Sequence, residues 1–166
     1  NAFRQDRAID KRMQENGGRI YRLGMMAVRE GDYDAAISAF EYIVDEKGET
    51  SPFYVQANKD MLTAKRLRIT NGFNYTEEEI RDLEKEYFNF LDLFGRTKAT
   101  IGIISELARL EAYYLNDLNL AIELMEEVIA MPFNPNAIDQ EALADAKLSL
   151  GDYYLDRKST RLNSSH

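Results

Sequence analysis

Helical periodicity runs through nearly the whole chain, and this pattern limits the possible fold more than any other property of the sequence. Apolar residues recur every three or four positions, and glycine, proline or asparagine interrupts them at short intervals. No long stretch alternates apolar and polar residues as a half-buried strand does. Asn71-Gly72, a pair typical of hairpin turns, lies between two helical patterns instead. We therefore expect an all-α protein.

Breaks and capping residues predict where the helices begin and end. We expect Asp32 to cap one helix, Ser51 with Pro52 to open another, and Thr76 to begin a third through a capping box with Glu79. The expected helices cover 2–15, 19–30, 33–47, 52–70, 76–94, 97–114, 118–131 and 138–155. Short turns alternate with longer ones along this series, as they do where helices pair and the pairs stack.

A repeat signature lies in the second and third of these helices. A Leu-Gly pair, Leu23-Gly24, follows the large apolar Ile20, and Ala36 and Phe40 stand four apart in the next helix. The pattern resembles the tetratricopeptide repeat (TPR), whose template is about 34 residues long. Independently of this resemblance, the small side chains of Gly24 and Ala36 would let the two helix backbones approach closely.

Looser matches to the template follow later in the chain. The matching residues are Ala121 in one second helix and Leu150, Gly151 and Tyr154 in the next first helix. Leu107-Ala108 can serve as the Leu-Gly pair before Ala121, although one extra residue then separates them. The template position that is usually aromatic is Ala27 in the first pair.

The resemblance implies a right-handed α–α superhelix, a TPR-like solenoid of about three helix pairs with flanking helices, of the divergent bacterial type. Residues 1–18 form a leading helix and a break, and 19–156 form the repeat domain. The pairs within that domain are 19–47, 52–94 and 97–131, and an unpaired helix covers 138–155.

The last residues, 157–166, are polar and resemble translated adapter or vector sequence. We expect them to form a disordered tail that is foreign to the natural protein. The repeat array of that protein would then continue after residue 156, and a part could also precede Asn1. The missing second helix predicts an exposed apolar side on the helix 138–155.

Composition excludes several classes of function. The chain has no cysteine, and its one histidine is His166, so disulfides, thiol nucleophiles and histidine-based metal or catalytic sites are ruled out. A net charge of −8 argues against nucleic-acid binding. No run approaches the roughly 18 apolar residues of a membrane span. The acidic clusters fit first turns and solvated faces of helices, so we expect no enzyme, no metal and no cofactor.

By the resemblance, first helices line the concave surface of the solenoid, which places Tyr21, Met25 and Val28 in a groove. Lys59 and Arg66 are seven apart on the next first helix and share a face, which suits an acidic peptide or a chain terminus. The alternative is that Met25 and Val28 pack against the preceding helix and that the basic residues balance nearby acids.

The function implied is a protein–protein interaction scaffold that binds a partner segment on its concave face. Two alternatives stay open. One is a purely structural spacer within a larger envelope or secretion assembly, and the other is an accessory segment of a larger protein whose catalytic domain lies elsewhere. The partner and the compartment are not indicated, because absence of cysteine suits cytoplasm and periplasm alike.

Overall fold

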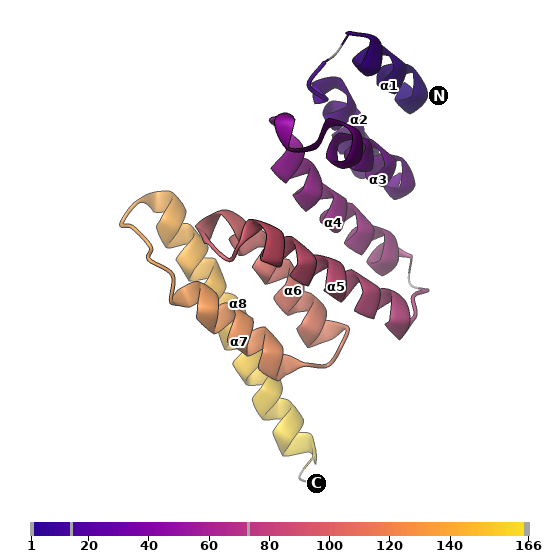
Figure 1. The fold of residues 1–166 in the computed structure, drawn as a ribbon. Coiled ribbons are helices and arrows are strands. Elements are labelled where there is room, and N and C mark those ends of the chain that lie inside the picture. Colours follow the sequence, from indigo (N-terminus) through magenta and orange to yellow (C-terminus); the bar gives the residue numbers. More distant parts are fainter. Residues whose placement is uncertain (1, 14, 73, 165–166) are drawn as a thin grey trace. The chain divides into compact units, whose positions relative to one another are not determined.

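The computed structural model describes residues 2–13, 15–72 and 74–164, apart from the side chains of residues 12 and 13. These ranges contain eight α-helices and no strand, which confirms the predicted all-α class (Figure 1). Asn1 and His166, on which two of the sequence predictions fall, lie outside them. The chain forms two compact units, Asn1–Tyr75 and Thr76–His166.

Unit 1 contains four helices, each packed on the next along the chain. They are α1 (Ala2–Met13), α2 (Gly18–Glu30), α3 (Tyr33–Tyr42) and α4 (Tyr54–Asn71). A π-helix, Ile43–Lys47, and a short 3₁₀ turn, Gly48–Thr50, connect α3 to α4. The core between the helices includes Ile20, Ala36, Phe40 and Ile43, none of which is exposed.

The close approach of α2 and α3 depends on one glycine. A Cβ added at Gly24 would lie only 2.5 Å from Cε1 of Phe40. Real Cβ atoms do not come this close to another heavy atom, so only glycine fits at this crossing without a shift. Ala36, the other small residue of the signature, is fully buried on α3.

Unit 2 also contains four helices. They are α5 (Glu77–Phe94), α6 (Ile101–Tyr113), α7 (Leu118–Ile129) and α8 (Ala137–Ser164), with a 3₁₀ turn, Lys98–Thr100, before α6. Contacts link α5 to α6, α6 to α7, and α7 to α8, while α6 also touches α8. Leu83 of α5, Ile104 of α6 and Val128 of α7 are buried.

The two units use the same turn between paired helices. In each, a residue with positive φ (Gly31 at 79°, Asn116 at 54°) precedes an aspartate whose side chain caps the next helix. Asp32 accepts from the backbone N–H of Ala35, and Asp117 accepts from that of Leu120. The backbone N–H of Asp32 bonds to the carbonyl oxygen five residues back, whereas that of Asp117 bonds six residues back, which accounts for the extra residue between Leu107-Ala108 and Ala121.

The predicted cap at Asp32 is confirmed, the Thr76 half of the predicted capping box is confirmed, and the predicted cap at Ser51 is wrong. The side chains of Asp32 and Thr76 accept from backbone N–H groups of α3 and α5. Ser51 does not cap α4, which begins at Tyr54. Its hydroxyl instead donates to the carbonyl oxygen of Asn16 at 2.6 Å and so joins the entry of α4 to the turn before α2. That partner lies too far away in sequence for a local pattern to indicate it.

Helix α8 corrects the expected disordered tail, because it continues through Ser164 in place of ending near residue 155. The segment has no glycine or proline to stop it, and each residue added to an existing helix gains a backbone hydrogen bond at little cost. Arg157 also donates to Asn119 of α7 at 3.1 Å.

The boundary between the units falls inside the predicted pair 52–94, so α4 and α5 belong to different units. Each unit therefore contains one complete short-turn pair, α2 with α3 and α6 with α7. Of the helices in the described ranges, none combines the length and the apolar character that crossing a bilayer demands.

Candidate functional site

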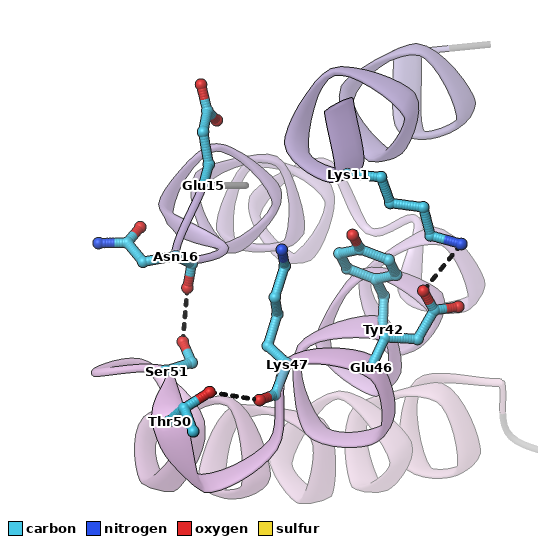
Figure 2. Close-up of a pocket in the computed structure, with 8 residues that line it drawn as sticks. All are labelled: Lys11, Glu15, Asn16, Tyr42, Glu46, Lys47, Thr50 and Ser51. Carbon is cyan, nitrogen blue, oxygen red and sulfur yellow. Dashed lines mark hydrogen bonds and ion pairs between the residues drawn. The ribbon is translucent and has the colours of Figure 1, made fainter. Parts of the chain in front are cut away.

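A pocket of about 460 Å³ opens in unit 1 beside the end of α1, the turn before α2 and the π-helix (Figure 2). It is lined by Lys11, Glu15, Asn16, Tyr42, Glu46, Lys47, Thr50 and Ser51. The lining is polar and carries both signs of charge. Figure 2 shows the Lys47 side chain standing between Asn16 and the ring of Tyr42.

A buried carboxylate, Asp10 of α1, organises this pocket. It accepts hydrogen bonds from the Tyr42 hydroxyl at 2.7 Å and from the backbone N–H of Gly17 at 3.0 Å, and it pairs with Lys47 Nζ at 2.5 Å. Burial and this hydrogen bond to Asp10 raise the pKa of Tyr42. Asp10 thereby connects α1, the turn before α2, α3 and the π-helix.

The rest of the pocket lining is held by bonds within the chain. Lys11 Nζ pairs with Glu46 at 2.9 Å, and Thr50 donates to the carbonyl oxygen of Lys47 at 2.8 Å (Figure 2). Both lysines of the pocket are therefore ion-paired, and a small ligand would have to compete with these pairs. The arrangement suits a structural joint between α1 and the following helix pair.

The predicted groove residues of α2 are largely packed. Tyr21 stacks on Phe53, with ring centroids 5.1 Å apart, and its hydroxyl donates to Asp60 Oδ2 at 2.6 Å. Burial and this hydrogen bond raise the pKa of Tyr21. Met25 and Val28 are half-buried against the core of unit 1. Tyr21 thus joins α2 to α4, and the packing alternative for Met25 and Val28 agrees with their burial.

The basic residues predicted for the groove, Lys59 and Arg66, lie on α4 and are half-buried. Both take part in interactions within the chain. The structure does not bring them together with the polar pocket of Figure 2, whose lining contains none of the predicted groove residues.

On α8, the predicted signature residues Gly151 and Tyr154 do not lie on the side of the helix that packs against its neighbours. Tyr153, not Tyr154, is buried, and its ring meets that of Tyr113 with centroids 5.9 Å apart. Tyr154 is exposed and donates to Glu126, while Gly151 faces open space. Leu150 is half-buried, and Ala121 on α7 is fully buried.

An apolar side of α8 is exposed, as the sequence predicts for a helix without a following partner. Leu148 is 68% exposed and Leu155 is 65% exposed, and seven positions separate them, so they share a face. Gly151 lies between them along this side with nothing within 4 Å of an added Cβ.

No protein-family model matches the chain, and no curated protein matches it. The TPR resemblance therefore depends on the residues of this chain alone. In the part of the chain that the structure describes, no group of three or more acidic or histidine side chains is arranged to hold a metal ion.

Proposed function

We propose that the chain is a helical-repeat interaction scaffold of the TPR type, which holds a segment of a partner protein and performs no catalysis itself. The observation that carries the proposal is that one helix-pair design occurs twice. The capped turns at Asp32 and Asp117 are alike, and fully buried alanines follow them at the same distance, Ala36 and Ala121.

Contacts between non-sequential helices support a stacked arrangement. In stacked pairs, a first helix contacts the next first helix as well as its own partner. Tyr21 makes this contact from α2 to Asp60 of α4, and Tyr113 makes it from α6 to Tyr153 of α8. In unit 1 the equivalent contact between second helices is the bond from Tyr42 of α3 to Asp10 of α1. A right-handed superhelix is the natural extension of this pattern.

The proposed partner surface is the first-helix face of unit 1, formed by Tyr21, Met25 and Val28 of α2 and Lys59 and Arg66 of α4. The face combines half-buried apolar side chains of α2 with two basic residues of α4, which suits a segment with both apolar and acidic residues. Such a segment also has a charge opposite to that of the two basic residues, which favours its encounter with this face.

Selection of random peptides displayed on phage against the full chain tests this function. We expect selected peptides to combine acidic and apolar residues. Arg66→Glu should weaken their binding at least about tenfold, or about 1.4 kcal/mol, because it places like charges in contact. Isothermal titration calorimetry measures the dissociation constants, and circular dichroism verifies that the variant is folded.

Lys147→Glu is the matched control, since Lys147 is exposed on α8 of unit 2. It makes the same change of charge and should leave binding unaltered. Peptides that bind both variants as they bind the parent chain would contradict the proposed surface. A selection that yields no specific peptide would favour the structural-spacer alternative.

A further inference from the structure

Helix α6 buries a glutamate in the core of unit 2. Glu111 has no exposed surface, and neither of its carboxyl oxygens makes a hydrogen bond of full geometry, although Glu84 lies close enough to act on it as a weak hydrogen-bond partner. The charged groups that act on it are Glu84 and Arg81 of α5 and Asp117, the residue that caps α7. Two of the three are acidic, so the surroundings disfavour a negative charge on Glu111.

Arg81, the cation that acts on Glu111, is already shared. Arg81 donates to Glu84 Oε1 at 3.3 Å and pairs with Glu77 at 3.6 Å. Glu84 is itself mostly buried, with 16% of its side chain exposed. Arg81 therefore offsets two other carboxylates on α5 before it can offset Glu111.

Unit 1 shows that the fold does not need an acid at this position. The backbone N–H of Asp117 donates to the carbonyl oxygen of Glu111, six residues back, and in unit 1 that of Asp32 donates to Ala27, five residues back. Ala27 and Glu111 also stand four residues after Leu23 and Leu107, the leucines of the repeat signature. Ala27 and Glu111 are thus equivalent, and both are buried. Where one unit has a methyl group, the other has an ionisable carboxyl group beside α5.

Burial and the neighbouring Glu84 raise the pKa of Glu111 to about 8, from an ordinary value of 4.5. Between pH 4.5 and about pH 8, Glu111 is protonated in the packed state, whereas an exposed Glu111 is ionised. The packed state is therefore favoured at the acidic end of this window, and opening becomes easier as the pH rises through it. Above about pH 8 Glu111 is ionised in both states, so the equilibrium between the packed and the open state no longer changes with pH.

We propose that Glu111 is a proton-dependent joint between α5 and α6, at which loss of one proton loosens the packing of α5. Helix α6 packs more extensively on α7 than on α5, so we expect α5 to separate from α6 first. Its release would uncover the apolar face formed by Ile80, Leu83, Tyr87 and Phe90. Mild alkalinity would thereby make this face of α5 accessible.

Hydrogen exchange of the full chain, followed by mass spectrometry from about pH 6 to pH 9.5, tests the joint. After correction for intrinsic exchange, the opening constant of residues 77–94 should rise up to tenfold per pH unit below about pH 8 and level off above it, since one proton is released. Residues 118–129 of α7 should not follow. Glu111→Gln should abolish the rise, whereas Glu123→Gln, on an exposed position of α7, should retain it.

Two results would contradict the proposal that Glu111 acts as a proton-dependent joint. One is an opening constant of α5 that does not depend on pH in the parent chain, or that depends on it equally in Glu111→Gln. The other is an equal change in α5 and α7, which would mean that the whole unit opens. Carbon-13 NMR titration of the Glu111 carboxyl group needs no variant, and a midpoint near the ordinary glutamate value would also refute the proposal.

Discussion

Gly24→Val should destabilise unit 1 by about 2–3 kcal/mol, the cost of forcing additional atoms into a packed core. The first added carbon would already lie 2.5 Å from Cε1 of Phe40, a ring with no exposed surface. Valine adds two further methyl groups at this crossing of α2 and α3. Urea unfolding monitored by circular dichroism gives the free energy of unfolding.

Gly151→Val is the matched control, because an added Cβ at Gly151 of α8 meets no atom within 4 Å. Valine is a slightly better helix former than glycine, so this variant should be neutral or more stable by a few tenths of a kcal/mol. Phe40→Leu in the Gly24→Ala background should recover part of the stability lost in Gly24→Ala. Equal losses in the two valine variants would show that close packing at Gly24 is not the cause.

Asp10→Ala should cost about 3 kcal/mol, the lower end of what is found when one partner of a buried ion pair is removed. Lys47, 17% exposed in its side chain, would keep its charge without Asp10, and the Tyr42 hydroxyl and the Gly17 N–H would lose their acceptor. We expect α1 to detach first, which hydrogen exchange in residues 2–11 detects.

The double variant Asp10→Ala with Lys47→Ala should be more stable than the sum of the single changes predicts, since neither charge is then left unpaired. The surface pair of Lys11 with Glu46 provides the control. Both side chains are about half exposed, so Lys11→Ala should cost less than 1 kcal/mol. A similar small loss in Asp10→Ala would mean that the buried pair does not hold α1 in place.

The sequence predicts the helices well because the signals for them are local. Asp32 and Thr76 lie within three residues of the backbone groups they cap, and the small residues Gly24 and Ala36 stand at fixed positions of a known pattern. The same local view misses the division into two units between α4 and α5, since nothing in the composition changes at residues 75–76.

The buried acids could not be predicted, because each resembles a solvent-facing residue of an amphipathic helix. The partners of Asp10 are Gly17, Tyr42 and Lys47, seven to 37 positions away, and the acid nearest to Glu111 is Glu84 on another helix. Only one signal hints at Glu111: alignment of the two pairs through Leu23-Gly24 and Leu107-Ala108 sets it opposite Ala27, a buried position.

The π-helix that ends α3 has a consequence for how the chain tolerates changes of length. The backbone N–H of Gly48 bonds to the carbonyl oxygen of Ile43, five residues back, so this turn holds one residue more than an α-turn. Deleting a residue here would restore ordinary winding and keep the helix intact. It would also carry Lys47 about 100° around the axis, away from Asp10. The position of Lys47 in the pocket wall therefore depends on the extra residue of the π-turn. The contact between Lys47 and Asp10 that holds α1 requires this residue, although the helix would remain intact without it.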